Sequence, residues 1–247
     1  MHWVEGFFDN EFFARDFALM KEEEELTARE ARFILSELAL RPHERVLDLA
    51  CGFGRHALQI APYVAEVVGV DRTASYIDDA RAEAEQRDVA NATFGVLDMR
   101  EVSFEAEFDA AYNYFCAWGY YDEDTNFEVL RRVRRALRPG GRFLLEFINR
   151  DGEARQLRRR SWVRRSDGVL VLYQRRLDCT TGRYHLHHTF IDPSGIREIE
   201  IDHQLPSSDE FARLFRRAGF REVRLVSAPD GGELTIDCDR LAVIGTV

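Results

Sequence analysis

The stretch Val46-Leu-Asp-Leu-Ala-Cys-Gly-Phe-Gly54 decides the fold. It reads as a buried strand that runs into a Gly-x-Gly turn, and a helix is expected from about Arg55 to Tyr63. Glycine has no Cβ, so the turn can be tight and a ligand can approach closely. The unpaired N–H groups of the helix start point toward that turn. Asp71 ends the next apolar strand, and this pairing predicts a ribose-containing ligand above the carboxyl ends of the strands.

Strands and helices alternate outward from this stretch. Strands are predicted at 45–50, 66–71, 92–98, 108–115 and 141–149, and helices at 54–64, 73–87 and 124–137. Short strands separated by helices predict a parallel sheet with right-handed crossovers. Arg138-Pro-Gly-Gly141 is expected to end the last of these helices with a turn. Two final strands, 221–226 and 240–247, have no helix between them and are expected to pair antiparallel.

The hydrophobic period changes between residues 157 and 204. Two-residue alternation and turn signals there predict an inserted antiparallel β-meander. A helix is predicted at 208–218, with Gly219 as its stop. We therefore expect a domain made of residues 41–149 and 207–247, with an inserted region, 150–206, that covers a substrate.

The first forty residues are predicted to be helical and to form a cap or lid. Thr27 and Glu30 have the form of a capping box. An aromatic cluster upstream would pack over the core or fold over the ligand: Trp3, Phe7, Phe8, Phe12, Phe13 and Phe17.

Composition narrows the class of protein. The 247 residues include 44 acidic and 34 basic side chains, a net charge of −10 that argues against general affinity for nucleic acid. The sequence shows no leader-like N-terminus and no run of 18 apolar residues, so we expect a cytoplasmic monomer or homodimer without membrane contact. The four cysteines form no C-x-x-C pair, and no metal site is predicted.

Two ligands fit the Gly-x-Gly turn. Gly52-Phe-Gly54-Arg-His-Ala57, with Asp71, satisfies the relaxed dinucleotide pattern, so a nicotinamide oxidoreductase is one reading. Asp48, however, would repel a pyrophosphate but suits an ammonium and sulfonium ligand. Leu97-Asp98-Met99 offers a carboxylate to an adenine amine and an apolar side chain to the base. These features favour S-adenosylmethionine.

The motifs together resemble the class I S-adenosylmethionine-dependent methyltransferases, of the small-molecule type. The resemblance covers residues 45–149 and the terminal strands, and it includes Gly69-Val-Asp71, Phe108-Asp109 and Leu137-Arg-Pro-Gly-Gly141. It implies an α/β, Rossmann-like fold: a seven-stranded, mostly parallel sheet with an antiparallel last strand and helices on both faces, plus the inserted antiparallel β-meander after strand 5. It also implies S-adenosylmethionine as cofactor and methyl transfer to an O, N or C atom.

The resemblance places cofactor contacts at the ends of the first four strands. Asp48 would lie near the amino group of the cofactor, Asp71 would accept the ribose hydroxyls and Asp98 would hold the adenine amine. The whole expected set is Asp48, Ala50, Gly52, Gly54, Asp71, Arg72, Asp98, Met99, Asn113 and Phe115.

The methyl acceptor is expected where the fourth and fifth strands end. The expected contacts are Phe115, Trp118 and Tyr120 in an aromatic loop, and Asn149. The segment Asn113-Tyr-Phe-Cys116 lacks the [N/D]-P-P-[Y/F] pattern of many nucleobase and protein-amide methyltransferases, which favours a small aromatic or anionic acceptor. Eight arginines in residues 155–176 would suit an anion or RNA, or would form a solvated surface. An RNA or protein methyltransferase and a non-catalytic cofactor-binding module stay as alternatives.

The candidates for a general base are Tyr120, Glu146, His185 and His187, with His203 as a further candidate. Imidazole titrates near neutral pH, which suits that role. The sequence pattern selects none of them.

Overall fold

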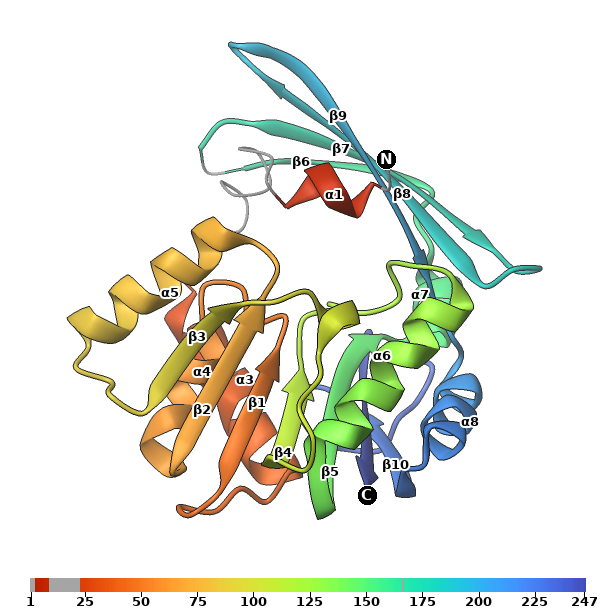
Figure 1. Cartoon of the computed structure of the whole chain (residues 1–247). Helices are drawn as coiled ribbons and strands as arrows, with labels where there is room; N and C mark the ends of the chain where they lie inside the picture. Colours follow the sequence, from red (N-terminus) through yellow and green to blue (C-terminus); the bar gives the residue numbers. More distant parts are fainter. Residues whose placement is uncertain (1–2, 9–22, 166) are drawn as a thin grey trace.

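The computed structural model describes residues 3–8, 23–165 and 167–247. A large sheet has the strand order β10-β11-β5-β4-β1-β2-β3 (Figure 1). Its strands are β1 (Arg45–Leu49), β2 (Glu66–Asp71), β3 (Ala92–Val96), β4 (Phe108–Asn113), β5 (Leu137–Ile148), β10 (Arg221–Ser227) and β11 (Arg240–Thr246). β11 runs antiparallel to both of its neighbours, and the other pairs are parallel. The predicted seven-stranded Rossmann-like sheet is confirmed.

Helices cover both faces of this sheet, as predicted. On one face lie α3 (Glu24–Glu37), α4 (Arg55–Ile60) and α5 (Ala74–Gln86), and on the other α6 (Glu123–Ala136) and α8 (Ser208–Ala218) (Figure 1). Successive strand residues serve opposite faces: Val46 packs with α3 and α4, whereas Leu47 packs with α6 and α8. The short 3-10 helices are η2 (Ala61–Tyr63) and η3 (Met99–Glu101). Burial of both faces explains why these strands are nearly continuous apolar runs.

A second sheet is the predicted meander, with antiparallel neighbours in chain order. It contains β6 (Arg160–Arg164), β7 (Leu170–Asp178), β8 (Arg183–Asp192) and β9 (Gly195–Gln204), and α7 (Arg150–Gln156) connects it to β5. The short helix α1 (Val4–Phe7) lies between the two sheets (Figure 1). Phe7 packs against the small sheet at Val171 and Phe190. Phe12, Phe13 and Phe17 lie outside the described residues.

Two local predictions are wrong. Thr27 and Glu30 do not form a capping box, because α3 begins at Glu24 and the Glu30 carboxylate contacts Arg55 and His56 instead. A capping box does occur at Ser207 and Glu210, at the start of α8. Residues 138–141 do not form a separate turn, since β5 already begins at Leu137 and Gly140 takes a φ of 78° within it.

None of the helices in the described part of the chain is both long and apolar enough to cross a membrane.

Candidate active site

A cavity of about 230 Å³ lies at the carboxyl ends of β1 to β5. Crossover topology opens a crevice at this edge of a parallel sheet, where ligands of such folds bind. Backbone and side chains from the ends of β1, β2 and β3 form one wall: Ala50, Gly52, Asp71, Arg72, Asp98 and Met99. α1, the aromatic loop after β4, and strands β8 and β9 close the other sides.

Asp71 ties the Gly-x-Gly turn to the end of β2. Its Oδ2 accepts a hydrogen bond from the Gly52 amide at 3.0 Å, and its Oδ1 accepts one from the Thr73 amide at 2.9 Å. Burial raises the pKa of Asp71, and these two amide donors oppose that shift. The turn itself is left-handed at Ala50 (φ 60°), Gly52 (φ 55°) and Gly54 (φ 76°). A non-glycine residue in this conformation is strained, and such strain gathers at functional sites.

Asp98 stands at the start of η3 on the same wall. Its carboxylate accepts hydrogen bonds from the Arg100 amide at 2.9 Å and from the Arg100 guanidinium at 3.0 and 2.8 Å. Burial opposes ionisation, but the bonds from Arg100 prevail and lower the pKa of Asp98. The guanidinium of Arg100 also lies 4.5 Å from the ring centroid of Tyr121, so the end of β3 and the aromatic loop are held together.

Asp48 and Asn113 lie behind the cavity wall rather than on it. Asp48 is 3% exposed, and the Tyr112 hydroxyl donates to its Oδ2 at 2.8 Å. Burial raises the pKa of Asp48 to about 7, although the Tyr112 hydrogen bond acts in the other direction. The Asn113 amide donates to the carbonyls of Leu49 and Ala117, at 2.9 and 3.1 Å. Asn113 therefore joins the end of β1 to the aromatic loop.

Glu146 holds the first turn of the aromatic loop. Phe115 and Cys116 both take positive φ values, 69° and 57°, and their amides donate to Glu146 Oε2 at 2.8 and 3.3 Å. Glu146 is 1% exposed and forms an ion pair with Arg240 of β11. Because both carboxylate oxygens are occupied, Glu146 positions the loop and does not face the cavity as a free base.

Tyr120 lies on the cavity wall beneath α1. The Trp3 and Tyr120 rings meet edge to face with centroids 5.3 Å apart. Trp3 Nε1 donates to the Asp202 carbonyl of β9 at 2.9 Å, and Tyr76 of α5 donates to the Phe8 carbonyl at 3.1 Å. α1 thus bridges the small sheet and the large domain. Burial raises the pKa of Tyr120 far above 10, so its hydroxyl stays protonated at neutral pH.

Trp118 and Asn149, two of the predicted acceptor contacts, also lie away from the cavity. Trp118 is 1% exposed, packs on Phe147 and Phe211, and donates to the Asn126 carbonyl at 3.2 Å. The Asn149 amide donates to the carbonyls of Thr235 and Cys238, at 2.9 and 2.8 Å. Both side chains are therefore buried behind the cavity wall rather than exposed on it.

His185 and His187 lie on the outer face of the small sheet. Their ring nitrogens are 3.4 Å from Asp202 and 3.6 Å from Glu198, respectively. The residue between them, Leu186, faces inward and lines the cavity. Successive side chains of β8 point to opposite faces of the small sheet, so these two histidines face away from the cavity.

Sequence reasoning missed several residues of the wall, namely Tyr76, Leu186 and Ile201. The two-residue alternation of β8 and β9 marks Leu186 and Ile201 as members of one apolar face. It does not show that this face closes over the large sheet.

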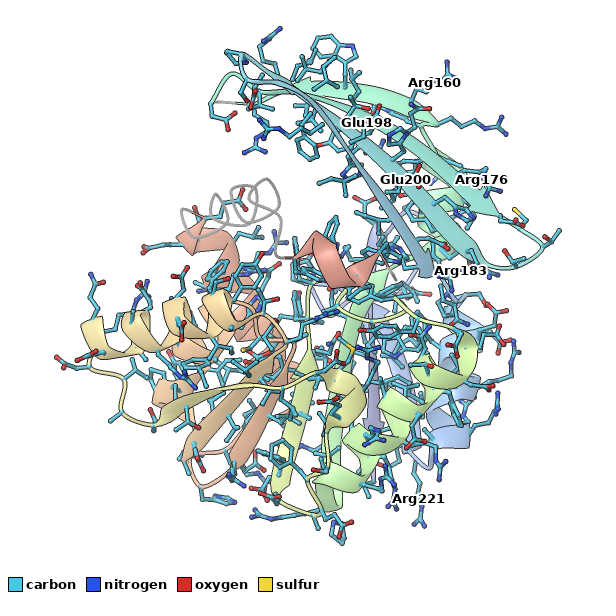
Figure 2. All side chains as sticks on the ribbon, turned by 45° about the horizontal axis from the view of Figure 1, so that its top comes forward. Arg160, Arg176, Arg183, Glu198, Glu200 and Arg221 are labelled. Carbon is cyan, nitrogen blue, oxygen red and sulfur yellow. The ribbon has the colours of Figure 1, made fainter. Side chains whose placement is uncertain are left out.

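The arginine-rich segment also lies outside the cavity. Arg159, Arg160, Arg175 and Arg176 line a groove on the small sheet, together with acidic residues such as Glu200 and Asp202. Figure 2 shows Arg160, Arg176, Glu198 and Glu200 on this sheet. Arg72 is the one arginine among the described residues that lines the cavity.

The strand order and the motif positions resemble those of class I, S-adenosylmethionine-dependent methyltransferases. Residues 46–141 match the family model described as "Methyltransferase domain". The chain is 34% identical over 106 residues to the uncharacterized methyltransferase YcgJ of Bacillus subtilis, a match that covers 42% of this chain and 41% of that protein. It is 41% identical over 76 residues to the 23S rRNA (uracil(1939)-C(5))-methyltransferase RlmD of Pseudomonas entomophila, covering 31% of this chain and 17% of that protein. The chain thus spans less than half of these curated relatives.

Solved structures resemble the chain over most of its length. The CcbJ methyltransferase from Streptomyces caelestis superposes with a TM-score of 0.76 at 21% identity and covers 88% of each chain. The sugar N-methyltransferase KedS8 from Streptoalloteichus sp. superposes with a TM-score of 0.62 at 19% identity, covering 87% of this chain and 84% of that one. The likeness shows a shared fold over most of the chain.

Proposed function

We propose that the protein is an S-adenosylmethionine-dependent methyltransferase that acts on a small, uncharged aromatic or apolar molecule. One observation carries the proposal: one continuous cavity runs from the carboxylates of Asp71 and Asp98 to an aromatic wall built by α1, the loop after β4 and the small sheet. The carboxylate end suits a cationic nucleoside, and the aromatic end suits an acceptor of low polarity.

The residues present fit the cofactor. Asp71 would accept the ribose hydroxyls, and Asp98, Leu97 and Met99 would hold the adenine. The backbone from Ala50 to Gly54 would meet the methionine portion. The bound cofactor supplies a methyl group that is already activated on a sulfonium. The chain therefore has to orient the acceptor and to exclude water, which α1 and the small sheet would accomplish as a lid.

The acceptor end supports an uncharged molecule over an anion. Four of the eight arginines that prompted the anionic and RNA readings line an outer groove beside Glu200 and Asp202, away from the cavity. One of them, Arg176, pairs with Asp178 at 3.4 Å on the protein surface. KedS8, a structural relative, is a sugar N-methyltransferase by its description, which supports a small acceptor. The match to RlmD covers less than a third of the chain, so its acceptor carries little weight.

Calorimetry with S-adenosylhomocysteine tests the cofactor assignment. We expect binding by the wild type and about 10- to 100-fold weaker binding by Asp71→Asn, because two charge-assisted hydrogen bonds to the ribose are weakened. Asn keeps one oxygen for the Gly52 amide, whereas the Thr73 amide loses its acceptor, so part of the loss comes from the turn itself. Asp78→Asn, on the exposed side of α5, is the matched control and should bind like the wild type. Heat with NADH but none with S-adenosylhomocysteine would overturn the proposal.

Methyl turnover separates the remaining alternatives. The wild type should transfer radiolabelled methyl groups to a fraction of small, uncharged metabolites. Transfer to RNA that falls steeply with added salt would instead support the nucleic-acid alternative. Cofactor binding without turnover on any acceptor pool would support a binding module.

A further inference from the structure

His203 is a buried histidine on the acceptor side of the cavity. It lies near the end of β9, is 4% exposed, and belongs to the cavity wall. The rings of Phe147 and Tyr184 meet its imidazole edge to face, with centroids 5.7 and 5.6 Å away. The preceding residue, Asp202, accepts the Trp3 hydrogen bond that anchors α1. The imidazole is therefore fixed at the junction of the small sheet, the large domain and α1.

The Nε2 atom of His203 is buried and has no hydrogen-bond partner within the described part of the chain. A buried polar atom without a partner is costly, so its presence in an apolar wall needs a reason. His56, another buried histidine, shows the ordinary solution, since its Nε2 lies 2.9 Å from Glu30. His187 Nε2 also has no hydrogen bond, but it lies 3.6 Å from the Glu198 carboxylate on the outer face of the small sheet. His203 is the one of these three histidines that belongs to the cavity wall, which points to a ligand that supplies the missing partner.

The side chains around His203 are uncharged on the cavity side. Burial lowers the pKa of His203 to about 4 and raises the pKa of Cys116 to about 12, and Tyr120 also stays protonated. Arg183, Asp202 and His185 act on His203 from the small sheet. The charged residues of the described wall, Asp71, Arg72 and Asp98, all lie at the nucleoside end. A neutral imidazole is thus the strongest hydrogen-bond acceptor among the described side chains at the acceptor end.

We propose that His203 binds the N–H of the acceptor and takes the proton that this nitrogen loses on methylation, so that the acceptor is a neutral aromatic amine or heterocyclic N–H compound. This inference rests on the proposed methyltransferase function. The nitrogen lone pair forms the new N–C bond, the C–S bond breaks toward sulfur, and the N–H proton passes to the imidazole. One positive charge is present before and after the step, and it moves from the sulfonium to the imidazole.

The weak basicity of His203 selects the kind of acceptor. A methylated aromatic amine that carries the extra proton is far more acidic than a protonated aliphatic amine, so a weak base suffices to remove that proton. An aliphatic amine arrives charged at neutral pH, and a phenol needs a stronger base. Both would be poor acceptors at this site.

Probe binding to the S-adenosylhomocysteine complex tests the assignment. We expect the wild type to bind aniline about tenfold more tightly than toluene and to reject benzoate. His203→Phe should lose the preference for aniline, and His203→Gln, which keeps an acceptor, should retain part of it. His187→Asn, on the outer face of the same sheet, should behave like the wild type. Nitrogen NMR of the wild-type histidines should show the His203 ring signals move with aniline and not with toluene.

The outcomes separate the two proposals. Absence of S-adenosylhomocysteine binding removes the proposed function itself. Cofactor binding with an aniline preference that survives in His203→Phe, or tighter binding of benzoate than of aniline, overturns the role of His203 alone. If His203→Phe does not fold, the NMR result on the wild type decides, and unmoved His203 signals overturn the inference.

Discussion

At the scale of single residues, Asp48 is a buried carboxyl beside the site that lowers the stability of the folded protein when it ionises. Its carboxylate is enclosed, and the hydroxyl of Tyr112 is its described hydrogen-bond donor. Burial raises the pKa of Asp48 from 3.8 to about 7, so near neutral pH the empty protein holds a carboxyl that resists ionisation. Perturbed carboxyls of this kind gather at functional sites, where a bound cation compensates for the cost.

The pH dependence of stability should reveal this carboxyl. The folded pKa lies above the unfolded value, so the native state binds the extra proton between pH 3.8 and about 7, and the contribution of Asp48 falls as the pH rises through that window. Asp48→Asn should match the wild type near pH 4 and become more stable than it toward pH 8, by up to about 4 kcal/mol. Urea unfolding at several pH values measures the difference. Asp78→Asn is the exposed control, and a difference independent of pH would contradict the assignment.

At the scale of elements, the ion pair between β5 and β11 controls the aromatic loop. Glu146 and Arg240 come from adjacent antiparallel strands, and the carboxylate of Glu146 also holds the left-handed turn at Phe115 and Cys116. The guanidinium groups of Arg55 and Arg240 lie 5.3 and 5.5 Å from the Phe115 ring centroid. The insertion of β11 into the sheet thereby positions the cavity wall.

Removal of Glu146 should therefore damage both stability and binding. Glu146→Ala leaves Arg240 without its buried partner and two amides without an acceptor, and we expect the free energy of unfolding to fall by about 3 to 5 kcal/mol. S-adenosylhomocysteine affinity should fall as well, since the Phe115 turn loses its support. Glu66→Ala, which breaks a half-exposed pair with Arg45, should cost about 1 kcal/mol or less. Equal losses in the two variants would refute the special role of Glu146.

At the scale of the whole molecule, α1 joins the two sheets around one cavity. Trp3 contacts β9 and Tyr120, and the Phe8 carbonyl accepts the hydrogen bond from Tyr76 on α5. A ligand in the cavity would touch all three parts at once. Its binding energy would then couple the small sheet to the large domain.

Hydrogen exchange should show this coupling. S-adenosylhomocysteine at 100 times its dissociation constant should add about 2.7 kcal/mol to the free energy of unfolding. Protection should rise in β8 and β9 as well as at the ends of β1 to β3. In Trp3→Ala the protection of β8 and β9 should be lost while that of the large sheet remains. Trp162→Ala, which removes a side chain that is 68% exposed on the small sheet, is the control. Protection confined to the large sheet in the wild type would argue against the coupling.

Local patterns predicted the elements well because local physics forms them. The helix at 208–218 has a capping box at its start and Gly219, with a φ of 99°, at its end, and both signals lie within a few residues. The strand ends after positions 96 and 113 were predicted too far along the chain. The chain leaves the sheet at these two positions and forms part of the cavity wall. Residue propensities do not predict where a chain leaves a sheet.

The sequence by itself determined the class of fold and the carboxylate end of the site. Strand, glycine turn and acidic residue follow one another within short stretches, and parallel strands bring their carboxyl ends to one edge. Only the tertiary structure decided the acceptor end. It turned Trp118 and Asn149 into the core, engaged Glu146 with Arg240, and set His185 and His187 on the outer face while it enclosed His203. The physical reason is that this wall joins α1, one loop and two strands distant in the chain, and which side of each strand faces inward depends on packing between the sheets.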